Sequence, residues 1–152
     1  LNISNTSVDG YRDNSEFENK QFNGRFEYSL SDSSSIVSTV HHTDQPLAND
    51  PGGITAEDVA TTPRQARTQN LNYQAGEKVK QTRFGLVYKT QLDKSRNVEV
   101  RTYNTDRDFS NKLPFQNGGI VNLDRSFYGG GLKYIEEGNL GKYQNRLLLG
   151  ID

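Results

Sequence analysis

Arginine side chains are the groups in this chain best suited to bind a ligand. Arg64 and Arg67 stand with Tyr73 in a long irregular segment, and Arg107 stands near the end of a predicted strand. A planar guanidinium matches the geometry of a carboxylate, and a tyrosine hydroxyl can donate a hydrogen bond. We therefore predict that Arg64, Arg67, Tyr73 and Arg107 bind an anionic ligand. The alternative is that strand arginines only line a wet interior and that loop arginines only face solvent.

No arrangement of residues predicts catalysis or metal binding. The chain has no cysteine, and we find neither a serine–histidine–acid set nor a Gly-x-Ser-x-Gly motif. His41 and His42 are adjacent, so in a strand they point to opposite faces and cannot bind one ion without a bulge. Asp9, Asp13 and Glu16 lack the spacing of a calcium loop. We predict that the chain is not an enzyme and holds no metal ion or cofactor.

The composition is unusual for a globular domain and gives no sign of a nucleic-acid partner. Only 32% of the 152 residues are hydrophobic, which is little for a packed core. The net charge is −1, whereas nucleic-acid-binding proteins leave a basic footprint. No apolar run reaches the roughly 18 to 20 residues that a membrane helix needs. Any membrane crossing would therefore have to use strands.

Alternation of polar and apolar residues predicts most of the structure as strands. Between Gln21 and Leu30, Phe22, Phe26 and Tyr28 alternate with polar residues, which predicts a strand with one apolar and one polar face. The pattern returns from Gln81 to Leu92. In all, we predict strands at Leu1–Val8, Phe17–Leu30, Ser35–Asp44, Lys78–Leu92, Asn97–Asp108, Ile120–Glu136 and Tyr143–Ile151.

The predicted connections alternate in length. Ser31–Ser34, Asp93–Arg96 and Glu137–Gly141 are short polar turns, whereas Gln45–Glu77 and Phe109–Gly119 are longer. If the strands run up and down, all short turns lie at one end of the sheet and the long connections at the other. Outer-membrane barrels have short periplasmic turns and long extracellular loops. A soluble meander can show the same alternation by chance.

Local signals refine two of these segments. Thr55 and Asp58 have the spacing of a helix N-cap, and Pro63 would end that helix after about two turns. Gly129, Gly130 and Gly131 weaken the strand that contains them and predict either close strand packing or a bulge.

Several segments resemble the barrels of TonB-dependent outer-membrane receptors. Asp9–Ser15 has the sequence DGYRDNS and resembles a DGYRxNS segment of those barrels. Asp44–Pro46, together with Asp50–Thr55, resembles a loop entry of siderophore-type members. Asp106–Phe115 and Leu123–Tyr134 fit the same region, so the resemblance covers nearly the whole chain.

This resemblance implies a fold, a location and partners. Members form 22-stranded transmembrane barrels in the bacterial outer membrane and import ferric siderophores or other scarce nutrients, driven by the TonB complex. We therefore expect residues 1–152 to be an all-β, antiparallel up-and-down meander of about seven strands, one part of such a barrel. The plug domain, the TonB box and the remaining strands would belong to the missing parts of the parent receptor. Lipid and the siderophore would be its other partners.

The alternative is a soluble all-β module that recognises a glycan or a protein through Gln45–Glu77. The two differ in what covers the apolar strand faces, which is lipid in a barrel and a second sheet in a sandwich. In both, period-two alternation predicts two sets of residues on opposite faces. The apolar set is Phe22, Phe26, Tyr28, Phe84, Leu86 and Tyr88, and the polar set is Arg25, Glu27, Arg83 and Lys89.

Overall fold

A computed structural model describes residues 1–117 and 119–152, which form one antiparallel sheet of seven strands in sequence order. The strands are β1 (Asn2–Val8), β2 (Phe17–Ser31), β3 (Ser34–Asn49), β4 (Gly76–Gln91), β5 (Arg96–Lys112), β6 (Ile120–Leu140) and β7 (Tyr143–Ile151). Two short helices, α1 (Ala56–Thr61) and α2 (Thr68–Asn72), lie between β3 and β4. The predicted seven-stranded up-and-down meander is thus confirmed.

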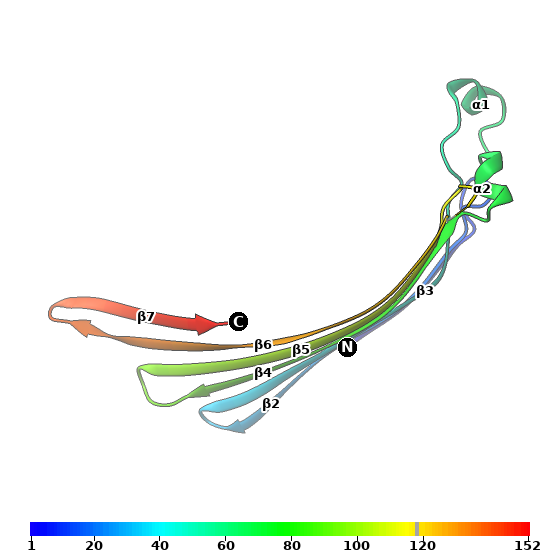
Figure 1. Cartoon of the computed structure of the whole chain (residues 1–152). Coiled ribbons are helices and arrows are strands. Elements are labelled where there is room, and N and C mark those ends of the chain that lie inside the picture. Colours follow the sequence, from blue (N-terminus) through cyan, green and yellow to red (C-terminus); the bar gives the residue numbers. More distant parts are fainter. Residues whose placement is uncertain (118) are drawn as a thin grey trace.

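The two ends of the sheet differ, as the connection lengths predict. Tight turns join β2 to β3, β4 to β5 and β6 to β7 at one end. The connections at residues 9–16, 50–75 and 113–119 lie at the other end, where Figure 1 shows α1 and α2. We call these the short-turn end and the long-connection end. No helix in the described part of the chain is long and apolar enough to span a membrane.

Strand register assigns every strand residue to one of two faces, because directly opposed residues in an antiparallel pair point the same way. One row across six strands is entirely apolar and consists of Tyr28, Ile36, Tyr88, Val100, Leu132 and Ile151. All six residues predicted for the apolar set share this face, and all four of the polar set lie on the other. We call them the apolar face and the polar face.

Nothing in the described chain covers the apolar face. The only buried hydrophobic residues among those described are Val37, Ala66 and Ala75, so the sheet has no core of ordinary size. Tyr28 is 70% exposed and Phe26 is 55% exposed, although both lie within a long strand. Figure 1 shows one curved layer without a second sheet against it. A large apolar surface is therefore exposed on one side of this sheet.

The apolar face is bounded toward the long-connection end by a charged row. That row consists of Lys20, Asp44, Lys80, Asp108 and Asp124 on five neighbouring strands. Lys80 stands between Asp44 and Asp108, so opposite charges are direct cross-strand neighbours there, whereas Asp108 and Asp124 are opposed like charges. Pairs of opposite charge stabilise a sheet, and their exposure keeps the contribution small.

Three strands extend further than the alternation predicts. β3 continues through Pro46 to Asn49, because the register shift between Gln45 and Ala48 takes this proline out of the regular ladder. A proline at a bulge removes no ladder hydrogen bond. β5 runs to Lys112, and β6 runs through the residues predicted as the third turn.

That third turn lies at Gly141, which has the positive φ of 65° that favours glycine. Because β3 and β5 extend further than predicted, the connections predicted at Gln45–Glu77 and Phe109–Gly119 are shorter in the structure. Gly118 lies outside the described residues.

The triple glycine in β6 produces no bulge. The register with β5 is continuous through Gly129, Gly130 and Gly131, so the close-packing interpretation is the one confirmed. A Cβ added at Gly129 would lie 2.6 Å from the hydroxyl oxygen of Tyr103, its direct cross-strand partner. The missing side chain makes room for the tyrosine ring over the polar face, an arrangement that protects a glycine within a sheet.

Candidate anion-binding site

Three arginines meet on the polar face of β4, β5 and β6. Arg107 of β5 stands directly opposite Arg125 of β6. Arg83 of β4 stands opposite Thr105, two residues before Arg107, and is therefore the diagonal neighbour of Arg107. The Cβ atoms of directly opposed residues lie about 4.5–5.5 Å apart. We call Arg83, Arg107 and Arg125 the arginine cluster.

Aromatic side chains surround the cluster and form the walls of a hollow with it. The hollow has a volume of about 640 Å³, and its aromatic lining residues are Tyr103, Phe109 and Phe127. The guanidinium carbon of Arg107 lies 5.5 Å from the centre of the Phe109 ring. This is within the range of a cation–π contact, which holds the guanidinium beside the hollow.

Charges elsewhere on the polar face are balanced. Near the short-turn end, Arg25 lies 3.0 Å from Glu27. Glu99 stands between two lysines, at 3.9 Å from Lys89 and 3.6 Å from Lys133. In contrast, no member of the arginine cluster forms an ion pair with any described residue. The hollow beside them contains no carboxylate in its lining.

The other predicted ligand residues lie away from this hollow. Arg64, Arg67 and Tyr73 belong to residues 50–75, and none of them lines the hollow that contains Arg107. Arg64 lies over the ring of Tyr11 at 5.1 Å. Arg67 is the N-cap residue of α2 and Tyr73 is its C-cap residue, so they stand at opposite ends of that helix. A binding role for these three remains a prediction.

A further arginine, Arg12, organises the long-connection end. Its Nε donates to the carbonyl of Gln65 at 2.9 Å, and its two terminal nitrogens donate to the carbonyls of Gly52 at 2.6 Å and Pro51 at 3.2 Å. One side chain of the β1–β2 connection thus binds three backbone groups of the β3–β4 connection. A guanidinium can satisfy several carbonyls at once because its donors form a rigid fork.

Asn70 completes the same structure from α2. It is 1% exposed, and its amide nitrogen donates to the backbone carbonyl and the carboxylate of Asp50 at 3.1 and 3.0 Å. Asn14 donates to the carbonyls of Asp50 and Ala75 at 2.8 and 3.1 Å. These bonds close the base of residues 50–75 onto the β1–β2 connection. We call Arg12, Asn14, Asp50 and Asn70 the loop clamp.

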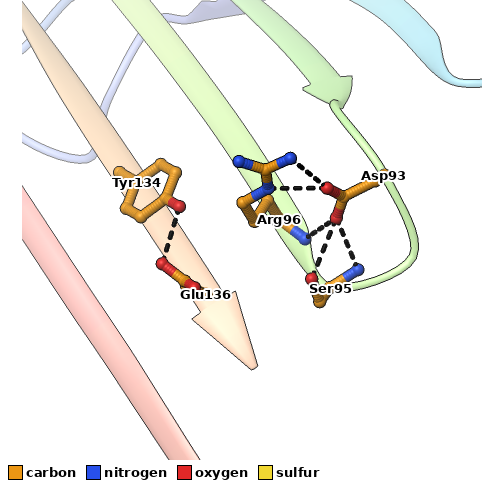
Figure 2. Close-up of polar contacts among 5 residues, drawn as sticks. All are labelled: Asp93, Ser95, Arg96, Tyr134 and Glu136. Carbon is orange, nitrogen blue, oxygen red and sulfur yellow. Dashed lines mark hydrogen bonds and ion pairs between the residues drawn. The ribbon is translucent and has the colours of Figure 1, made fainter. Parts of the chain in front are cut away.

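The short-turn end has a polar network of a different kind, shown in Figure 2. One carboxylate oxygen of Asp93 accepts from the backbone amides of Ser95 and Arg96 and from the Ser95 hydroxyl, each at 2.9 Å. The other accepts from Arg96 Nε at 2.6 Å. These bonds, led by the one from Arg96, hold the pKa of the Asp93 carboxyl far below its ordinary value. Beside this turn, Tyr134 donates to Glu136 at 2.8 Å.

The histidines form no shared site. His41 pairs through Nδ1 with Asn23 at 2.8 Å, and His42 pairs with Thr82 at 2.9 Å. The two rings lie on opposite faces of β3, as their adjacency predicts. Among the described residues, no group of three or more histidine, cysteine or acidic side chains is arranged to hold a metal ion.

No protein-family model matches this chain. The sheet, its two faces and the arginine cluster are therefore the features that bear on function. Of that cluster, sequence reasoning selected Arg107 as a ligand residue but did not select Arg125, whose importance depends on the strand register.

Proposed function

We propose that this chain is a segment of a TonB-dependent outer-membrane receptor that imports a ferric siderophore or a similar scarce nutrient. In this proposal, the seven strands are part of a larger transmembrane barrel. The apolar face contacts lipid and the polar face lines a wet interior. The long-connection end lies outside the cell, and the short-turn end lies in the periplasm.

The uncovered apolar face is the observation that carries the proposal. A soluble protein rarely exposes a contiguous apolar patch larger than a few hundred Å². Here one row of apolar side chains continues in register across six strands, further apolar residues flank it, and no described element packs against them. Lipid is the environment in which such a face is stable while the opposite face carries charges.

The dimensions of the apolar face support the same conclusion. On β2 it runs from Phe22 to Leu30. At a rise of about 3.4 Å per residue these eight steps cover about 27 Å of strand. At the tilt of about 40° found in outer-membrane barrels, this length spans about 21 Å of height, close to their apolar band of about 25 Å. The charged row that contains Lys80 and Asp108 begins where this band ends.

The choice of receptor class depends on the resemblance of Asp9–Ser15 and its companion segments. Two of the resembling segments, Asp9–Ser15 and Asp50–Thr55, contain residues of the loop clamp, and Arg12 joins them by hydrogen bonds to Pro51 and Gly52. Motifs that are separate in the sequence thus form one structural unit. This supports treating them as one combined feature of the receptor class.

Site-directed spin labelling of the parent protein tests the proposal. Tyr28, Tyr88 and Leu132 would be replaced singly by cysteine on the apolar face, and Thr39 and Val87 on the polar face. Each variant would be labelled in outer-membrane vesicles or liposomes. We expect apolar-face labels to collide with dissolved oxygen and to be shielded from a water-soluble nickel chelate. Polar-face labels should show the reverse.

A soluble module would give a different result. Its apolar face would be packed against protein, so labels at Tyr28 and Tyr88 would be inaccessible to both reagents. A monodisperse, cooperatively melting monomer of residues 1–152 in buffer without detergent would also contradict the proposal. Open sheet edges and a bare apolar face promote aggregation in water.

A further inference from the structure

We propose that the arginine cluster is a binding site for a multiply charged anionic chelate that carries aromatic rings, and that it selects such chelates over neutral ones. This inference rests on the proposed function, because it requires the polar face to line a wet interior that solutes enter. It goes beyond that function by naming three residues and the charge class of the ligand. It also separates the site from Arg64 and Arg67.

The opposed pair Arg107 and Arg125 is the strongest reason. Like charges placed directly opposite each other across two strands destabilise a sheet. Arg83 adds a third positive charge on the diagonal. An anion bound among them would convert this repulsion into attraction, because each guanidinium offers donors suited to an anionic oxygen. The arrangement is therefore more favourable with an anion bound than without one.

The rest of the polar face shows that this excess of positive charge is confined to the arginine cluster. Arg25 and Glu27 are paired, and Lys89 and Lys133 share Glu99. A surface that only needed to face water would have the same mixed character throughout. Asp108 and Asp124 lie next to the arginine pair in sequence, but they point to the apolar face. Neither can therefore contact a ligand on the polar face.

The shape and lining of the hollow indicate the kind of anion. A volume of about 640 Å³ falls within the range of small-molecule sites, about 300–1,000 Å³. Tyr103, Phe109 and Phe127 present aromatic surface beside the three cations. Rings of a ligand can stack on these side chains while its charged oxygens meet the guanidinium groups. A chelate with catechol-type arms has both features.

Binding of two matched probes to the purified parent protein in detergent tests the inference. Ferric tris-catecholate is a trianion with three aromatic rings, whereas ferric tris(acetohydroxamate) is neutral and holds the same metal in six oxygens. We expect Arg107→Gln to weaken binding of the catecholate complex about tenfold, the value of one charge-assisted hydrogen bond. The double variant with Arg125→Gln should weaken it about a hundredfold. Binding of the hydroxamate complex should not change.

Matched controls separate this effect from general damage. Arg25→Gln removes an arginine of the same face that already has a partner in Glu27, and it should leave both affinities unchanged. Without ligand, Arg125→Gln should melt at the same temperature as the wild type or slightly higher, because it removes a repulsion. Phe127→Leu removes an aromatic lining residue other than Phe109, whose ring lies beside Arg107. It should weaken the catecholate complex about threefold but leave binding of ferric citrate, a non-aromatic anion, unchanged.

Two results would overturn the inference. One is unchanged catecholate binding in the double variant, and the other is an equal loss for the catecholate and hydroxamate complexes. Failure of the proposed function gives a distinct result in the spin-label experiment, which is that labels at Tyr28 and Tyr88 are inaccessible to both oxygen and the nickel chelate. The two experiments use different residues and different readouts, so failure of the inference can be distinguished from failure of the proposed function.

Discussion

The contacts that stabilise the two ends of the sheet differ in the sequence separation of their partners. At the short-turn end, Asp93 binds groups only two or three residues away, as Figure 2 shows. At the long-connection end, Arg12 binds three carbonyls that lie 39 to 53 residues away in the sequence. Asn14 reaches Ala75 across 61 residues. The tight turn at Asp93 is thus bonded largely within itself, apart from the Glu137 amide that donates to the Ser95 carbonyl at 2.8 Å, whereas the loop clamp exists only when distant connections of the chain have folded together.

This difference between the two ends indicates which connections can move independently. Long loops that move independently are held by few buried contacts. Residues 50–75 instead enclose a buried Asn70 and a fully buried Ala75, and they are bonded to the β1–β2 connection. We therefore expect these two connections to move as one body. Substitutions in the loop clamp should alter hydrogen exchange at residues far away in the sequence, whereas substitutions in a tight turn should alter it only nearby.

The largest effect is expected from Arg12→Ala. It leaves three carbonyls without their charged donor, which should lower the free energy of local opening by about 3 kcal/mol. Hydrogen exchange of the Arg67 amide, which donates to Pro51, should rise about a hundredfold. The matched control is Arg64→Ala, which removes only a contact with Tyr11. Equal exchange in both variants would show that the clamp is not what holds this end.

Gly52→Ala should have the next largest effect. Gly52 has a φ of 67°, and an added Cβ would lie 2.4 Å from the buried Oδ1 of Asn70. Backbone strain and displacement of Asn70 together should cost about 2 kcal/mol. Gly53→Ala is the control, because an added Cβ there meets nothing within 4 Å. Protease cleavage within residues 50–75 should accelerate in the first variant alone, and cleavage of both at the wild-type rate would contradict the prediction.

Much of the fold follows from the sequence because period-two alternation is a local property. Phe22, Phe26 and Tyr28 show their shared face without any knowledge of neighbouring strands. The order of the strands and the two ends of the sheet follow from the lengths of the connections. The helix at Thr55 follows from a capping pattern within four residues, and the structure shows both bonds of that capping box.

The arginine cluster shows where such reasoning ends. The pairing of Arg107 with Arg125 means that the β5–β6 hairpin is centred on residue 116. The predicted connection Phe109–Gly119 is centred on residue 114, which would place Arg107 opposite Val121 instead. The true centre depends on how far β5 extends beyond Asp108, and polar residues there carry no alternation signal. The loop clamp was missed for a related reason, since its bonds span tens of residues.

Thr55→Ala tests whether α1 can lose stability without any change in the loop clamp at the same end of the sheet. Thr55 accepts a hydrogen bond from the Asp58 amide at 3.1 Å, and the Asp58 carboxylate accepts from the Thr55 amide at 3.1 Å. Loss of this cap should destabilise α1 by about 1 kcal/mol. Exchange of α1 amides should increase about fivefold, while the Arg67 amide stays protected. Thr61→Ala, at the other end of α1, is the control, and a change that spreads to Arg67 would contradict the separation.

The smallest effect is expected from Asp93→Asn, because the whole network is exposed and local. The pKa of the Asp93 carboxyl is lowered in the folded turn, mainly by the hydrogen bond from Arg96. The contribution of the Asp93 carboxylate to the stability of the turn is therefore fully present above the ordinary aspartate pKa of about 4 and is lost progressively as the pH falls from there toward the much lower folded value. Protection of the Ser95 and Arg96 amides should therefore be lower at about pH 3 than at about pH 6, after correction for intrinsic exchange rates.

The asparagine side chain of the variant can still accept from these two amides, but it loses the ion pair, so protection should be lower at both pH values. Asp32→Asn, in the turn between β2 and β3, should change nothing at Ser95, since it alters a different tight turn of the same end. If wild-type protection were instead equal at pH 6 and about pH 3, the pKa of Asp93 would be the same in the closed and the open turn, and the local network would not hold the turn. If the variant altered exchange at Arg67, at the opposite end of the sheet, the contrast between local and long-range ends would itself be wrong.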